Sequence, residues 1–185
     1  MSFENRHLYG VAADALSLSR IVGAPLVASW LRTTPPEQRT RKHCLIVGAL
    51  GATDKLDGLL GRKAGDRPWS KWLDRWADKI YATLVEKALS DNGEISPLHW
   101  QLKVLRDGVV EVARLRAQQH GAVTSSPRLN QWKTTVELGL IAAASSPLAR
   151  RRGVLEGLAV VATGLSVITG VNSIRNLSIN SRESL

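Results

Sequence analysis

Six apolar segments of helical length, separated by short polar stretches, constrain the fold of this chain most strongly. The segments occupy residues 12–32, 43–60, 71–90, 101–119, 133–149 and 153–174. The stretches between them contain proline or glycine, or are too polar to span a membrane. Each segment is close to the length that crosses a hydrocarbon layer, although charged residues interrupt all six. We therefore expect an all-α fold, an integral-membrane bundle of six transmembrane helices that forms one domain over residues 1–185.

The overall composition also admits a soluble helical protein. Mean hydropathy is only -0.08, and the net charge of +9 would suit a nucleic-acid-binding protein. We favour anionic lipid and phosphorylated substrates over nucleic acid, because the basic residues gather in loops around an acidic stretch and no nucleic-acid-binding motif is recognisable. Charges inside the apolar segments are then expected to line a water-accessible cavity rather than to face lipid.

Two pairs of aspartates lie in the stretch from residue 54 to residue 78. Asp54 and Asp57 are three residues apart, and Asp74 and Asp78 are four apart. On helices, each pair projects from one face, so two facing helices would gather four carboxylates in one small volume. Their mutual repulsion needs cations to offset it, and hard oxygen ligands select magnesium, manganese or calcium. The spacing predicts a divalent-metal site, with a solvated helix face as the alternative.

Glycines and basic residues accompany the aspartates. Gly58 and Gly61 share the face of the first pair, so a flat ligand could approach that helix closely. Arg62 follows at once and suits a phosphorylated substrate. Asp66, which lies in the glycine- and proline-containing turn, is expected to form that turn rather than to bind metal.

This stretch resembles the signature of the CDP-alcohol phosphatidyltransferases. The matching positions are Asp54, Asp57, Gly58, Gly61 with Arg62, Ser70, Asp74 and Asp78. Gly61 stands where alanine is usual, and Ser70 stands where glycine is usual and adds a hydroxymethyl group beside the nucleotide.

The resemblance continues outside the signature. Residues 12–31 look like the first membrane helix of the family, with Arg20 in its usual place. Residues 105–121 and 130–135 are similar to phosphatidylglycerophosphate synthases within that family. There Asn130 and Gln131 replace a usual glycine and lysine, whereas Lys133 and the threonine after it agree.

The resemblance implies transfer of a phosphatidyl group from CDP-diacylglycerol to glycerol 3-phosphate, with release of CMP. The metal, Mg²⁺ or Mn²⁺, would be held by Asp54, Asp57, Asp74 and Asp78, and Asp78 would also be the general base. The donor would contact Gly58, Gly61, Arg62 and Ser70. Three cations, Arg106, Arg114 and Lys133, would bind the acceptor's phosphate, with anchoring to lipid headgroups as their alternative role. Asp107 is expected to pair with Arg106.

The resemblance also implies a homodimeric, multi-pass protein of the cell inner membrane, whose polar cavity and active site face the cytoplasm. The count of lysine and arginine in the loops does not fix this orientation by itself. No cleavable signal peptide is expected from the sequence MSFENRHLYG, and the sole cysteine, Cys44, excludes an internal disulfide framework. Two alternatives remain: a family member with another acceptor, such as inositol phosphate or a second phospholipid, and a non-catalytic membrane protein with a degenerate site.

Overall fold

The computed structural model describes residues 3–65, 67–119 and 128–183 of the chain. These residues form six α-helices and two short 3-10 helices, Pro36–Gln38 and Pro147–Arg150, and contain no β-strand. The α-helices are α1 (Phe3–Thr33), α2 (Arg41–Ala64), α3 (Pro68–Asp91), α4 (Pro97–Gln119), α5 (Arg128–Ala144) and α6 (Arg152–Glu183). The expectation of an all-α fold with six helices is confirmed.

Glycine and proline set the ends of the central helices. Gly65 follows α2 with a φ of 94°, a conformation that other residues rarely adopt, and its N–H donates to the carbonyl of Gly61 at 3.2 Å. Pro68 opens α3, where the first N–H groups have no helical partner and a missing N–H costs nothing. Gly93, with a φ of 68°, follows α3 in the same way. Asp66, the predicted turn residue, lies outside the described residues.

The fifth helix differs from the predicted segment 133–149. It begins at Arg128 and ends at Ala144, and a separate 3-10 helix follows it. Pro147 explains the early end, because proline has no N–H to continue the helical ladder and disfavours helical backbone at the preceding residue. That residue, Ser146, instead caps the short helix by accepting a hydrogen bond from the N–H of Leu148 at 3.1 Å.

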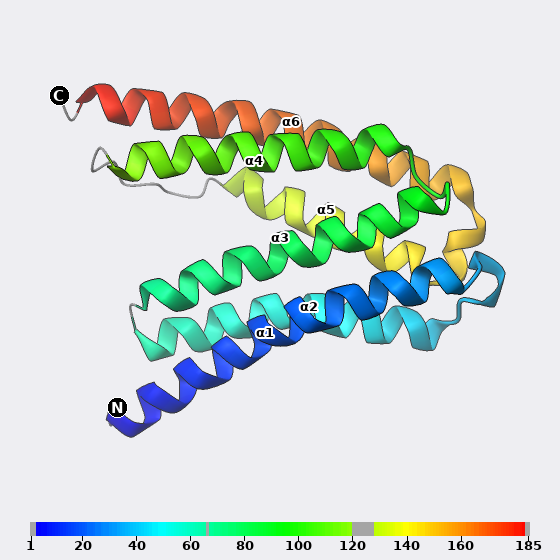
Figure 1. The fold of residues 1–185 in the computed structure, drawn as a ribbon, viewed down its shortest axis with the longest axis horizontal. Helices are drawn as coiled ribbons and strands as arrows, with labels where there is room; N and C mark the ends of the chain where they lie inside the picture. The colour runs from blue at the N-terminus through cyan, green and yellow to red at the C-terminus, as the bar shows by residue number, and fades with distance from the viewer. Residues whose placement is uncertain (1–2, 66, 120–127, 184–185) are drawn as a thin grey trace.

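The helices form two groups of three. Helix α1 packs against both α2 and α3, and α6 packs against both α4 and α5. Contacts of α3 with α4 and of α5 with α2 and α3 join the groups. Figure 1 shows the start of α1, the end of α6 and the α2–α3 turn at one end of the bundle, called here the turn end. The α1–α2, α3–α4 and α5–α6 connections lie at the other, called here the loop end.

The apolar core fills the half of the bundle near the loop end. Fully buried members of this core come from four helices and one connection: Leu31, Leu89, Ile95, Leu140 and Leu155. A buried ion pair closes this end, because both terminal nitrogens of Arg39 donate to Glu94, at 2.5 and 2.6 Å. The other half of the bundle is therefore left for polar residues.

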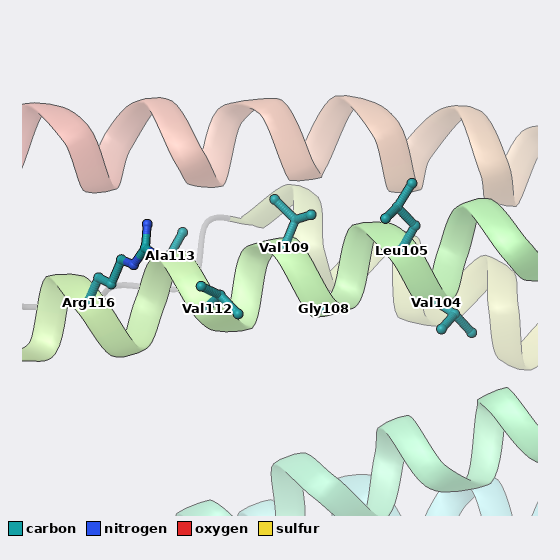
Figure 2. Close-up of a pocket in the computed structure, with 7 residues that line it drawn as sticks. All are labelled: Val104, Leu105, Gly108, Val109, Val112, Ala113 and Arg116. Carbon is teal, nitrogen blue, oxygen red and sulfur yellow. The ribbon is translucent and has the colours of Figure 1, made fainter.

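Charged side chains are buried in that other half while apolar ones cover its outside. The charged residues buried there and at the middle of the bundle are Arg20, Asp57, Asp107, Glu111, Lys133 and Glu137, whereas Glu86 and Lys103 form a buried ion pair nearer the loop end. Exposed valine, leucine and isoleucine residues cover α4 and α6, and seven residues of α4 line an open, mostly apolar groove of about 510 Å³ (Figure 2). This distribution reverses that of soluble proteins and is typical of helices in lipid.

Helix length and composition identify fewer candidate membrane spans than the six that the sequence predicts. Among the described residues, two helical segments are long and apolar enough to cross a membrane, Arg6–Thr33 and Arg152–Arg175. Helices α2, α3 and α4 carry many charges, several of them buried, and α5 has only 17 residues. The count of six transmembrane spans therefore stays a prediction.

Candidate active site

The four signature aspartates converge where α1 packs between α2 and α3. Asp54 and Asp57 project from α2, and Asp74 and Asp78 project from α3. One carboxylate oxygen from each of Asp54, Asp57 and Asp74 lies within 4.8 Å of the other two. The structure thus brings the two pairs together, as their spacing predicted.

Arg20 of α1 lies among these carboxylates and is only 1% exposed. Its Nη1 donates to Asp54 at 3.2 Å and also to Asp78. Its Nη2 donates to Asp74 at 2.7 Å and also to Asp57. Each terminal nitrogen therefore bridges one aspartate of α2 and one of α3.

The donor atoms of this cluster fit a hard divalent cation. Asp57 is buried; its Oδ2 accepts a hydrogen bond from Ser17 at 3.0 Å, while its Oδ1 is buried without a hydrogen-bond partner. A buried carboxylate oxygen left without a partner is costly, and a bound cation removes that cost. Because all the ligand atoms are carboxylate oxygens, magnesium, manganese and calcium are the matching ions.

A cavity of about 910 Å³ extends from the aspartates to α4 and α5. Eight cationic side chains and five acidic ones line it. The cations are Arg20, Arg62, Arg75, Lys79, Lys103, Arg106, Arg114 and Lys133, and the acids are Asp54, Asp74, Asp78, Asp107 and Glu137. The excess of positive charge favours an anionic ligand.

Two of the four predicted donor contacts, Gly58 and Arg62, line this cavity. A Cβ added to Gly58 would meet no atom within 4 Å, so the helix surface there is open to a ligand. Gly61 also has open space beside it but is not among the described residues that line the cavity.

Ser70 points to a neighbouring helix instead. Its hydroxyl donates to Asp14 on α1, which also accepts a hydrogen bond from Arg67 at 2.8 Å. Ser70 is not among the described residues that line the cavity. This replacement of a usual glycine therefore ties the start of α3 to α1, and a contact of Ser70 with the donor stays a prediction.

The three predicted acceptor-binding cations all line the cavity, and each is held by a carboxylate. Arg106 lies 2.6 Å from Asp107, which confirms the expected ion pair. Lys133 lies 3.3 Å from Asp107 and 3.3 Å from Glu137. These pairs hold the two cations on the cavity wall.

Glu111 of α4 organises a second group of cations. Its carboxylate lies 3.2 Å from Arg75 and 2.6 Å from Lys79, both on α3, and 3.3 Å from Arg114 on α4. Glu111 is only 7% exposed, so three cations share one largely desolvated carboxylate. Because three cations share one carboxylate, this group keeps a net positive charge, and all three cations line the cavity.

Sequence reasoning noted Arg20 in its usual place in the family but did not predict its contacts with the aspartates, and it missed Lys103. Arg20 is the sole basic residue in the apolar stretch 12–31, and an isolated charge of this kind was the available signal. Lys103 is 2% exposed and lies 3.0 Å from Glu86 and 3.8 Å from Glu137. Its partners are on other helices, so no local spacing indicates them.

The family model described as CDP-alcohol phosphatidyltransferase matches residues 10–171 of the chain. The matched range includes Arg20, the four aspartates and every cation that lines the cavity. The side chains of Asn130 and Gln131, where the sequence departs from its usual pattern, lie outside the described residues.

Proposed function

Because the chain belongs to the CDP-alcohol phosphatidyltransferase family, we propose that it transfers a phosphatidyl group from CDP-diacylglycerol to glycerol 3-phosphate and releases CMP. The family itself implies an enzyme with a CDP-alcohol donor and an alcohol acceptor. One observation carries the finer proposal: a single cavity joins the aspartate cluster to cations of α4 and α5. It offers a metal site for the donor and cations for a phosphorylated acceptor within reach of each other.

The donor occupies the side of the cavity formed by α2 and α3. The four aspartates would hold Mg²⁺ or Mn²⁺, which would supply positive charge against the donor's pyrophosphate and the departing CMP. Cytidine packs on the bare surface at Gly58, where a Cβ would find open space, with Gly61 and Ser70 at its edge. Arg62 lines the cavity and pairs with a donor phosphate.

Asp78 acts as the general base. Its carboxylate lines the cavity and is 38% exposed, so an acceptor hydroxyl can reach it. The hydroxyl oxygen attacks the phosphorus that carries the lipid, and its proton passes to Asp78. The new P–O bond forms as the bond to CMP breaks, and CMP leaves with the electron pair of that bond.

The acceptor occupies the side formed by α4 and α5. Arg106, Arg114 and Lys133 line the cavity there, and a small dianion needs several convergent cations to hold it. Their carboxylate partners keep these side chains in place before the acceptor binds, which lowers the entropy that binding costs. The acceptor's phosphate then shares these cations with Asp107 and Glu111.

The protein works within a membrane in this proposal. Support comes from the buried charges beneath an apolar exterior, and from Trp69, Trp72 and Trp76, which lie exposed at the start of α3. Indole rings prefer the membrane interface, so this series marks the turn end as an interfacial end. We place the turn end and the active site at the cytoplasmic face of the inner membrane, and we expect a homodimer, as the family resemblance implies.

The test is CMP release from CDP-diacylglycerol by detergent-purified protein with Mg²⁺. Glycerol 3-phosphate, inositol phosphate, serine and no acceptor are compared, and chelation of the metal should stop the reaction. Asp78→Asn should slow the reaction by about 10² to 10⁴ fold, the usual contribution of a general base. Asp91→Asn is the matched control, because Asp91 ends the same helix at the loop end and pairs with Lys87 at 2.7 Å.

The acceptor panel separates the alternatives. Release with inositol phosphate alone would keep the family and change the acceptor. If a folded protein that binds metal releases no CMP with any acceptor, a non-catalytic role would be favoured. Activity unchanged in Asp78→Asn would refute the assignment of the base.

A further inference from the structure

The aspartate cluster already contains a cation that belongs to the chain itself. Arg20 comes from α1, donates to all four carboxylates and is 1% exposed. Each of its terminal nitrogens bridges α2 and α3, a geometry that the planar guanidinium fork allows and a lysine ammonium does not. Arg20 thereby offsets the repulsion of four crowded carboxylates and ties three helices together.

A divalent cation and Arg20 require the same oxygens. A carboxylate oxygen that accepts a guanidinium hydrogen bond offers less of its electron density to a metal, and two cations in a partly buried cluster repel each other. We propose that Arg20 competes with the divalent cation for the four aspartates, so that it weakens metal binding and stabilises the bundle when metal is scarce. This inference rests on the metal site of the proposed function but on neither of its substrates.

The cavity gives the displaced side chain a place to go. Arg20 is among the residues that line the 910 Å³ space, and its Nε is buried without a hydrogen-bond partner. The guanidinium is therefore held by its terminal nitrogens, and we expect it to leave the carboxylates by a change of side-chain rotamer. Metal occupancy would then be linked to the position of a positive charge on the cavity wall.

The test measures Mn²⁺ affinity of the full-length, metal-stripped protein in detergent, without substrate, from the electron paramagnetic resonance signal of free Mn²⁺. Arg20→Met should bind Mn²⁺ about tenfold more tightly than the wild type, equivalent to about 1.4 kcal/mol. Arg20→Lys keeps the charge but loses the fork, and its affinity should fall between the two. Arg39→Met is the matched control, because Arg39 is an equally buried arginine paired with Glu94 at the loop end, and its Mn²⁺ affinity should equal the wild type's.

Thermal unfolding gives a second readout that does not depend on activity. The rise in Tm on adding Mn²⁺ should be larger for Arg20→Met than for the wild type, since the variant lacks the internal cation. If Arg20→Met does not fold without metal, Arg20→Lys decides: tighter Mn²⁺ binding than the wild type supports competition. Equal or weaker binding by the Arg20 variants overturns the competition alone, whereas a lack of Mn²⁺ binding by the wild type and by both Arg20 variants contradicts the proposed metal site itself.

Discussion

Replacing Lys103 with methionine should strongly destabilise the bundle, because Lys103 neutralises two buried carboxylates. Its ammonium lies 3.0 Å from Glu86 and 3.8 Å from Glu137. Glu86 is fully buried, and Lys103 is 2% exposed. Methionine keeps most of the side-chain volume, so the change removes the charge with little effect on packing.

The expected loss is large because one buried charge is left without its main partner. Breaking a buried ion pair in this way costs about 3 to 5 kcal/mol. For a chain of 185 residues this corresponds to a fall in Tm of roughly 10 °C. Glu137 keeps Lys133 at 3.3 Å as a second partner, so most of the loss should come from Glu86.

The assay uses the sole cysteine of the chain. Cys44 is partly buried in α2, so a thiol-reactive dye reports its exposure as the detergent-solubilised protein unfolds on heating. Lys87→Met is the matched control, because Lys87 pairs with Asp91 on the exposed surface at 2.7 Å, and such pairs contribute about 0 to 1 kcal/mol.

A double variant tests the reasoning more severely. Glu86→Leu combined with Lys103→Met removes both charges, and replacing a whole buried pair by apolar residues is often neutral or stabilising by about 1 to 4 kcal/mol. The fall in Tm of the double variant should therefore be at most half of the fall caused by Lys103→Met alone. The reasoning is refuted if Lys103→Met unfolds at the same temperature as Lys87→Met. It is also refuted if the fall in Tm of the double variant equals the sum of the falls caused by Glu86→Leu alone and by Lys103→Met alone.

Ser70→Ala should cost about 1 kcal/mol through the lost hydrogen bond to Asp14. It should also raise the KM for CDP-diacylglycerol, because Ser70 lies at the edge of the proposed cytidine site; an unchanged donor KM would show that Ser70 only ties α3 to α1. Arg114→Met should raise the KM for glycerol 3-phosphate by about tenfold or more through one lost charge-assisted contact. Arg116→Met, in the outer groove of α4, is its control, and equal effects would count against the assigned acceptor site. Val160→Asp, at a position of α6 that is 67% exposed, should reduce membrane insertion by about 2.5 to 3.5 kcal/mol; undiminished recovery in the membrane fraction would show that this face does not contact lipid.

Local spacing predicted the parts of this structure that depend on one helix. The six helices follow from apolar segments of helical length and from the glycine, proline and polar residues between them, and the aspartates converge because each pair shares a face. The predicted end of the fifth helix was wrong because most of residues 133–149 are apolar, and an apolar run by itself does not show that Pro147 prevents the helix from continuing.

Contacts between helices were beyond such reasoning. The sequence around Arg20 does not indicate that α1 packs between α2 and α3. Only that packing brings the Arg20 guanidinium to the aspartates. The same holds for Glu111, whose three cations include two from α3. These pairings depend on how the helices are arranged, which a pattern within one helix does not contain.

The division of the bundle into an apolar half and a polar half has a mechanical consequence. At the loop end, close-packed side chains and the Arg39–Glu94 pair resist separation of the helices. At the turn end, separating the helices mainly exchanges one set of polar contacts for another, with water or phosphate as the new partners. The loop end should therefore act as a pivot about which the turn end splays to admit the proposed lipid donor, and amide hydrogen exchange should be slower on the loop-end half of each helix than on the other.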